Sequence, residues 1–233
     1  MKLDSASIAY IKLVVETAQL VGIDDLIIEP NKVRAMNEEK TVVIFQEKDV
    51  PDMVFNSVGL NRIGVFLNRL EVAKTQDNFA VEVITDENNE FARSIKMSAK
   101  GFKVDYRCAN PKTIGAPRKL SEEWIYNIEL TPQAVYMLQK GQAAMSTDRV
   151  SLINNDNGAT FEFSDINSDK FSHTFTKRVS MIEGTNESFT YKYPIKVLLP
   201  LFKYDPEGSF EIGRRGMLKI VVNNLNIFVL PQA

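Results

Sequence analysis

Hydrophobic and polar positions along this chain follow a helical period in some segments and a strand-like alternation in others. The first helical segment has apolar residues three and four positions apart, which is typical of the buried face of an amphipathic helix: Ile8, Ile11, Val15 and Ala18. Asp4 or Ser5 can cap its start, and Gly22 can end it. We therefore predict a helix over residues 3–21.

Short segments separated by turn residues come next and predict strands at residues 26–29, 32–36, 41–46 and 52–55. A second helix is expected over residues 58–74, because one apolar stripe runs along it: Leu60, Ile63, Phe66, Leu67 and Leu70. Further strands are expected at residues 79–84, 90–97 and 102–108. The first half therefore has the order helix, strands, helix, strands.

Residues 110–126 differ from what precedes them, because their first part contains Pro111, Gly115 and Pro117 and has no apolar period. We interpret this segment as a linker between an N-terminal domain, residues 1–109, and a C-terminal domain, residues 127–233.

The second half repeats the order of the first. A helix is expected over residues 132–145 with Thr131 as its N-cap, and another over residues 194–203, which Pro200 should kink or shorten. Strands are expected at residues 149–153, 160–163, 170–179, 209–212, 217–222 and 226–230. An open antiparallel sheet needs one covered face, and helices can cover it. We therefore predict an α+β protein of two similar domains, each with antiparallel sheets and two helices.

Composition limits the chemistry that this chain can perform. It has 233 residues, 44% of them hydrophobic and 25% charged, with a formal net charge of −2. This charge excludes a uniformly basic surface but permits a local basic face. One cysteine, Cys108, and one histidine, His173, cannot form a disulfide or a zinc site. The sequence contains no phosphate-binding glycine loop, dinucleotide fingerprint or triad motif, so we expect a binding protein, not an enzyme, with no cofactor and no metal.

Basic residues recur on the predicted helices. Arg62 and Arg69 are seven residues apart, which places them on one helix face, and Lys196 and Lys203 have the same spacing. Lys12 and Lys140 add one cation to each remaining helix. Any one of these side chains could simply face solvent, but the repeated pattern suggests contact with a phosphate backbone. Arg214 and Arg215 are a weaker candidate, because a basic pair between glycines is common in hairpin turns.

The chain resembles the DNA sliding clamps of T-even-type phages and, more distantly, the proliferating-cell nuclear antigen clamps. The resemblance rests on its length, the central linker, and three short segments: Met1-Lys2-Leu3 before the first helix, Gly59-Leu60-Asn61 at the second, and Phe228-Val229-Leu230-Pro231 near the end. It implies two clamp-fold domains per subunit and three subunits in a closed ring, with helices on the inner side and sheets on the outer side.

The resemblance also implies where subunits and partners meet. Residues 103–108 would pair with residues 170–177 of a neighbouring subunit, which places five side chains at the interface: Val104, Tyr106, Phe171, His173 and Phe175. The second of these strands could equally be internal to one sheet. Partner peptides would enter a pocket beside the linker and near the C-terminus, formed by Ile114, Leu120, Trp124, Phe228, Leu230 and Pro231. Simple docking of the linker is the alternative for Ile114 and Leu120.

The partners that follow from the resemblance are double-stranded DNA, a DNA polymerase, a clamp loader and two further copies of the chain. The N-terminus has no apolar signal-peptide core and no run spans a bilayer, so we expect a cytoplasmic protein, in the host cell if it is phage-encoded. Two other classes remain open. A virion structural or adaptor protein would lack a basic inner face, and an enzyme would need carboxylates in a deep pocket at the domain interface.

Overall fold

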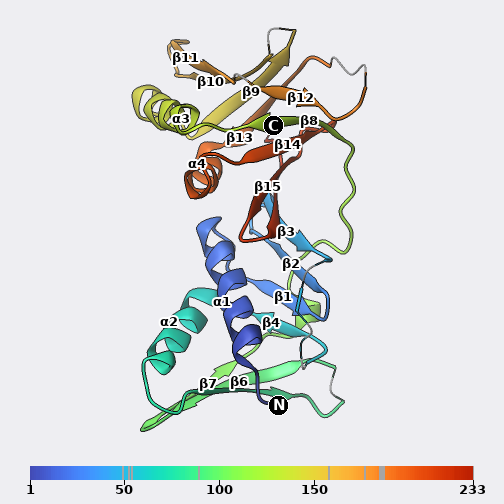
Figure 1. The fold of residues 1–233 in the computed structure, drawn as a ribbon, viewed down its shortest axis with the longest axis vertical. Coiled ribbons are helices and arrows are strands. Elements are labelled where there is room, and N and C mark those ends of the chain that lie inside the picture. Colours follow the sequence, from blue (N-terminus) through green and yellow to red (C-terminus); the bar gives the residue numbers. More distant parts are fainter. Residues whose placement is uncertain are drawn as a thin grey trace. The chain divides into compact units, whose positions relative to one another are not determined.

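The structure, a computed structural model, describes residues 1–48, 50–51, 53, 55–88, 90–156, 158–175, 177–183 and 187–232. The chain divides into two compact units: Met1–Lys119 with Asn223–Leu225, and Leu120–Val222 with Asn226–Ala233. In each unit two helices cover one side of antiparallel sheets (Figure 1). The prediction of an α+β fold with two helices per half is therefore confirmed.

The first unit contains two groups of strands. The first group has the order β3 (Val42–Gln46), β2 (Lys32–Met36), β1 (Leu26–Glu29), β4 (Val58–Leu60). The second has the order β5 (Ala80–Thr85), β6 (Ala92–Ala99), β7 (Phe102–Arg107), so that β7 lies at the edge of its sheet. The turn between β6 and β7 is tight because Gly101 takes a positive φ of 73°.

Helix α1 (Ser5–Leu20) begins at a side-chain cap, because the Asp4 carboxylate accepts a hydrogen bond of 2.7 Å from the backbone N–H of Ser7. Helix α2 (Ile63–Lys74) begins later than predicted. Val58–Leu60 form β4 instead and pair with β1, as in the register of Leu60 opposite Leu26. A short apolar segment suits either element, and pairing with a distant strand decides the matter here.

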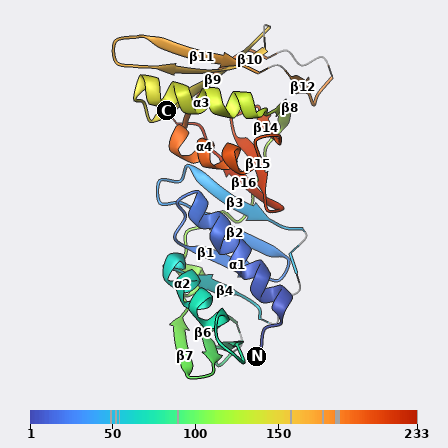
Figure 2. The ribbon, with the colours of Figure 1, turned by 60° about the vertical axis from the view of Figure 1, so that its left-hand side comes forward.

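The described residues from Leu120 onward form nine strands and two helices. One sheet has the order β11 (Lys170–Thr174), β10 (Gly158–Ser164), β9 (Arg149–Asn155), β13 (Phe189–Pro194), with β11 at its edge (Figure 2). The other strands follow the order β12 (Arg178–Ser180), β8 (Trp124–Glu129), β14 (Ser209–Gly213), β15 (Leu218–Val222), and β16 (Leu225–Val229) is next to β15. The helices are α3 (Pro132–Met145), capped by the Thr131 hydroxyl, and α4 (Ile195–Tyr204).

Several predicted strands are corrected by the structure. Strand β8 begins inside the predicted linker, and β13 was not predicted. The single strand expected over residues 170–179 is two strands in different sheets, β11 and β12. The strand expected at residues 52–55 includes Asp52 and Val54, which lie outside the described residues. The linker contains one short 3-10 turn, η1 (Pro111–Thr113), capped by the Asn110 side chain.

Aromatic side chains fill the cores. Tyr106 and Phe66 meet edge to face in the first unit, with ring centroids 5.1 Å apart. Phe202 and Phe210 lie 5.2 Å apart in the second unit. The part of the chain that the structure describes contains neither a helix long and apolar enough to cross a membrane nor a group of three or more His, Cys, Asp or Glu side chains that could hold a metal ion.

Candidate nucleic-acid interface

The helices carry a net positive charge because acidic residues are scarce on them. The four helices of the described residues carry six basic side chains, Lys12, Arg69, Lys74, Lys140, Lys196 and Lys203. They carry two acidic ones, Glu16 and Glu71. Their net charge is therefore +4, although the chain as a whole has a net charge of −2. The helical side of each unit is thus basic, and the strands and loops carry the acidic excess.

Arg62 and Arg69 share one aromatic platform. Their guanidinium carbons lie 5.8 Å and 6.0 Å from the centroid of the Tyr106 ring. The ring is fully buried, its hydroxyl donates a hydrogen bond to the backbone carbonyl of Asn61, and burial raises the pKa of Tyr106 to about 12. A neutral, fixed ring therefore holds both cations on the same surface.

The predicted shared face of these two arginines has a different origin from the one expected. Arg62 precedes α2 and has a left-handed backbone with a φ of 53°, so a helical repeat does not relate it to Arg69. Tyr106 on β7 brings them together instead. Arg62 is exposed and Arg69 is half-buried, so both can be reached from solvent.

Lys12 differs from the other predicted cations, because two carboxylates balance its charge. Its Nζ lies 2.8 Å from Glu71 Oε1 on α2 and 3.4 Å from Glu16 Oε1 on α1. The hydrogen bond with Glu71 is the main reason why the pKa of Lys12 is raised. Lys12 therefore joins the two helices of the first unit, and this cluster of three residues has a net charge of −1.

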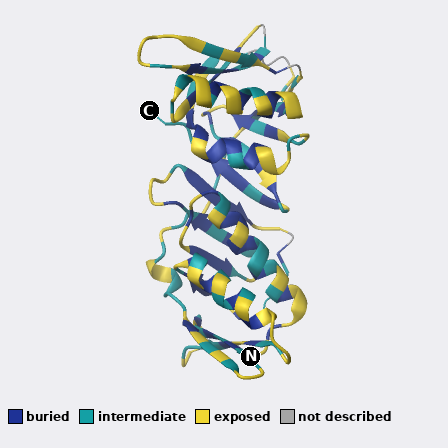
Figure 3. Cartoon of the chain, turned by 90° about the vertical axis from the view of Figure 1, so that its left-hand side faces the viewer, coloured by how far each residue is buried: buried dark blue, intermediate teal, exposed yellow. Residues whose placement is uncertain are grey.

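In the second unit the predicted cations lie on helices without acidic residues. Lys140 on α3 is exposed, with its Nζ 5.2 Å from the centroid of the Tyr136 ring. Lys196 and Lys203 are exposed near the two ends of α4. Figure 3 shows exposed residues along the outward sides of α1, α2 and α3, whereas α4 is mostly buried.

Two further groups of basic residues change the predicted set. Lys74, in the last turn of α2, is exposed and was missed, because the spacing of seven residues did not include it. Arg214 lies 3.2 Å from Glu123 and 2.9 Å from Glu187, and Arg215 lies 3.3 Å from Glu122. Arg214 and Arg215 are therefore paired with carboxylates, and they stabilise the start of the second unit at Glu122 and Glu123.

The predicted interface strands are both at sheet edges, but two of their side chains are core residues. Tyr106 is buried beneath the arginines, and Phe175 packs against Phe161 at 5.1 Å. Their side chains are not available to a partner, because they complete the cores of their own units. Val104, Phe171 and His173 are half-buried, and burial lowers the pKa of His173.

The predicted partner pocket is divided between the two units. Trp124 and Phe228 stack in the second unit with ring centroids 6.0 Å apart, and Lys219 Nζ lies 5.8 Å from the Trp124 ring. Leu120, Leu230 and Pro231 are half-buried residues of the same unit.

Ile114 belongs to the first unit. A Cβ at Gly59 would lie 3.0 Å from Ile114 Cδ1 and 2.6 Å from the carbonyl oxygen of Ala109, so the absence of a side chain at Gly59 lets this part of the linker dock on β4. Docking of the linker, the alternative expected for Ile114, is therefore present at this residue.

Known structures share this fold over its whole length, although no family model matches the chain and no curated protein matches its sequence. The proliferating cellular nuclear antigen (PCNA) of A. fulgidus, with the C-terminal region of FEN-1 bound, is 12% identical, covers 97% of this chain and 96% of its own, and has a TM-score of 0.62. The PCNA2–PCNA3 complex from Sulfolobus tokodaii is 15% identical, the match covers 99% of this chain and 98% of that chain, and the TM-score is 0.60. The beta clamp of Helicobacter pylori, bound to a DNA ligase peptide, is 11% identical; the match covers 96% of this chain and 64% of that chain, and the TM-score is 0.62. The chain therefore has the clamp fold.

Proposed function

We propose that this protein is a DNA sliding clamp, a ring that encircles duplex DNA and tethers the replicative polymerase. The observation that carries the proposal is the net charge of +4 on the helices of an otherwise acidic chain with the clamp fold. If these lysines only faced solvent, acidic residues would be expected beside them on the same helices, but α3 and α4 contain none.

The cations would hold DNA through its phosphates, without reading bases. Lysine and arginine side chains that meet phosphates supply affinity independent of sequence, which suits a protein that must move along the duplex. Arg62, Arg69, Lys140, Lys196 and Lys203 would make these contacts. Lys12 would contribute less, because Glu16 and Glu71 already balance it.

The ring would close through the edge strands. A head-to-tail ring needs two different, complementary surfaces on each subunit. β7 and β11 each have one side without a strand partner among the described residues. Three subunits, each with two clamp-fold domains joined by the linker, would pair β7 of one with β11 of the next, and Val104, Phe171 and His173 would pack at the seam.

Partner proteins would bind on the outer side. The surface around Trp124 and Phe228, with Leu120, Leu230 and Pro231, is the proposed site for peptides of the polymerase and the clamp loader. We propose that the clamp is of the T-even phage type and acts in the host cytoplasm.

Two measurements test the proposal. Light scattering gives the mass in solution, for which we expect a trimer. The protein is then mixed with nicked circular plasmid under crowding, which favours association, and passed through a sizing column before and after the circle is cut with a restriction enzyme. A clamp stays on the circle and leaves the linear product. A monomer, or retention that does not change on cutting, would contradict the proposal.

A further inference from the structure

Helix α3 presents an aromatic ring to solvent on the basic, helical side of the second unit. Tyr136 is 52% exposed, so much of its apolar ring faces water. Its hydroxyl has no hydrogen-bond partner among the described residues, and Lys140 Nζ lies 5.2 Å from the centroid of its ring. Packing within the fold therefore does not explain why an aromatic side chain is present at this position.

The helix that carries Tyr136 is fixed in place by its own unit. The Thr131 hydroxyl caps its first turn, one turn before Tyr136. Gly141 is buried and lets the helix lie close to the sheet, because a Cβ there would lie only 2.6 Å from side-chain atoms of Phe163 and Phe171. A ligand would therefore meet a surface that is already ordered, which lowers the entropy lost on binding.

The exposed face of α3 suits an anionic ligand with flat, polar groups. The helix contains no acidic residue, and Lys140 gives it a net charge of +1. Gln133 and Gln139, three residues before and after Tyr136, are exposed beside it, and each amide can both donate and accept hydrogen bonds. Single-stranded nucleic acids are bound by such a combination, in which cations meet phosphates and aromatic rings stack on bases.

The aromatic ring distinguishes this face from the other proposed DNA contacts. Lysine and arginine meet the phosphates of a duplex without an aromatic group, and inside a duplex the neighbouring bases cover both faces of each base. An unpaired base has a free face, and its stacking on an aromatic side chain depends little on which base it is. Tyr204 at the end of α4, the other exposed tyrosine of the described helices, differs from Tyr136 because it already has an interaction within the fold.

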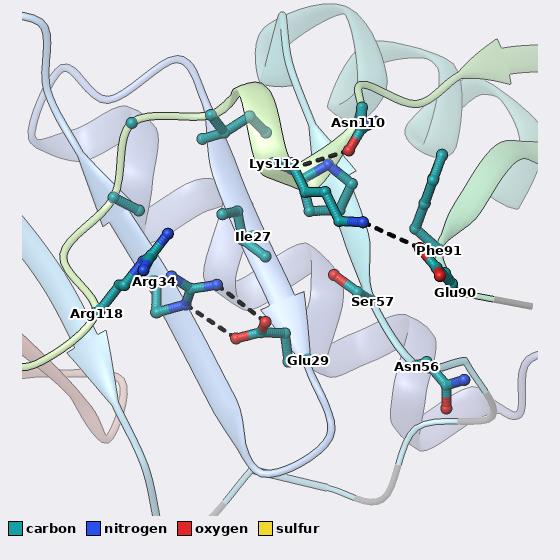
Figure 4. A pocket seen from close by; sticks show the side chains of 14 residues that line it. Ile27, Glu29, Arg34, Asn56, Ser57, Glu90, Phe91, Asn110, Lys112 and Arg118 are labelled. Carbon is teal, nitrogen blue, oxygen red and sulfur yellow. Dashed lines mark hydrogen bonds and ion pairs between the residues drawn. The ribbon is translucent and has the colours of Figure 1, made fainter.

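A cavity of about 520 Å³ in the first unit has less suitable chemistry for a nucleic acid. Two carboxylates line it, Glu29 and Glu90, which are paired with Arg34 and Lys112 (Figure 4). Their negative charges would repel phosphates. The acid-free face of α3 is therefore the better site for a single strand.

We propose that α3 binds an unpaired nucleotide of single-stranded DNA, with the base stacked on Tyr136 and a neighbouring phosphate paired with Lys140. Gln133 and Gln139 form hydrogen bonds with the polar edges of the bases beside it. The site lets the protein recognise duplex DNA that continues into a single strand, such as the template beyond the end of a primer. The proposal rests on the proposed function in taking DNA as the ligand, but it does not require a closed ring.

Binding of a fluorescein-labelled oligothymidylate of about 12 nucleotides, a length typical of single-strand sites, tests the proposal. Fluorescence anisotropy measures its affinity for the full-length protein and, in parallel, that of a duplex of the same length. Tyr136→Leu should weaken single-strand binding by about fivefold to a hundredfold, because one stacked base contributes about 1–3 kcal/mol. Duplex binding should stay nearly unchanged. Tyr136→Phe keeps the ring and should bind both ligands as the parent protein does.

Tyr204→Leu is the matched control, because Tyr204 is 53% exposed, lies on the other helix of the same unit and follows a lysine. Its single-strand affinity should stay close to that of the parent protein, and equal melting temperatures would show that all variants are folded. An oligothymidylate with one 5-iodouracil should, on irradiation, form a cross-link to the peptide that contains Tyr136.

Four results would each overturn the proposal: equal losses in the two leucine variants, an equal loss for duplex and single strand, a loss in Tyr136→Phe, or no binding of the oligothymidylate by the parent protein, which would leave Tyr136 to a protein partner. Failure of the clamp proposal would look different. Retention on the plasmid would then not depend on the intact circle, while single-strand binding would still depend on Tyr136.

Discussion

The pair Arg62 and Arg69 gives the sharpest test of the proposed DNA interface. Both cations lie about equally far from the Tyr106 ring, so they form one positive surface in each subunit. Replacing both with glutamine removes two charges per subunit and leaves the buried ring in place. We expect weaker DNA binding with an unchanged oligomer, because neither side chain belongs to an edge strand.

The magnitude follows from counterion release. Each phosphate contact contributes about 0.9 to the slope of log affinity against log salt concentration on duplex DNA. Two contacts in one subunit therefore account for a slope of about 1.8, and a ring that used all its copies would lose up to three times as much. Fluorescence anisotropy with a duplex, over a series of salt concentrations, measures this slope directly.

The control removes the same charge elsewhere. Arg93 and Lys100 are exposed residues of β6 and of the turn that follows it, so Arg93→Gln with Lys100→Gln matches the change in net charge outside the helices. This variant should retain nearly the whole slope. If both double variants lose the same slope, the effect comes from net charge alone, and if neither loses any, the two arginines do not meet phosphates.

Three further substitutions test single contacts. Tyr106→Phe should lower the free energy of unfolding by about 1 kcal/mol, from the lost hydroxyl hydrogen bond, and leave DNA affinity unchanged; a large loss of affinity would mean that the hydroxyl, not the ring, positions the arginines. Gly59→Ala should cost about 1–3 kcal/mol in a denaturant titration, because its Cβ would meet the Ala109 carbonyl at 2.6 Å, and a neutral result would refute the tight docking. Glu71→Gln should strengthen DNA binding by releasing Lys12, with Glu90→Gln as the control; equal affinities would exclude Lys12 from the interface.

Local signals predicted the elements that local interactions determine. Helices α1 and α3 have an apolar period and a side-chain cap, Asp4 and Thr131, and the structure places both helices within two residues of the expected bounds. The predicted start of α2 was wrong because Val58–Leu60 pair with β1, whose partner residues lie 30 to 34 positions earlier in the chain. The apolar period of residues 58–74 contains no information about pairing with a distant strand.

The same distinction applies to the candidate site. Spacing along the chain picked out the exposed cations Lys196 and Lys203 on α4, because a helix determines the direction of its own side chains. It could not reveal that Tyr106 from β7 lies beneath Arg62 and Arg69, or that Glu71 neutralises Lys12. Both facts depend on packing between elements that are distant in sequence.

The proposed seam should respond to pH through His173. Burial disfavours the charged imidazolium, so the pKa of His173 in the folded protein lies below its ordinary value of about 6.5. The unfolded chain therefore takes up this proton first as the pH falls. The contribution of His173 to stability is complete above pH 6.5 and is lost as the pH falls through that value toward the lower pKa of the folded state.

Closure of a ring over β11 would bury His173 further and increase this effect, because more desolvation lowers its pKa again. We therefore expect the trimer to dissociate more readily below pH 6.5 than above it, as measured by light scattering over a dilution series. His173→Gln keeps a polar side chain of similar size but cannot take up a proton, so it should remove this part of the pH dependence. An identical pH dependence in both proteins would place His173 outside the seam, and β11 would then need another role.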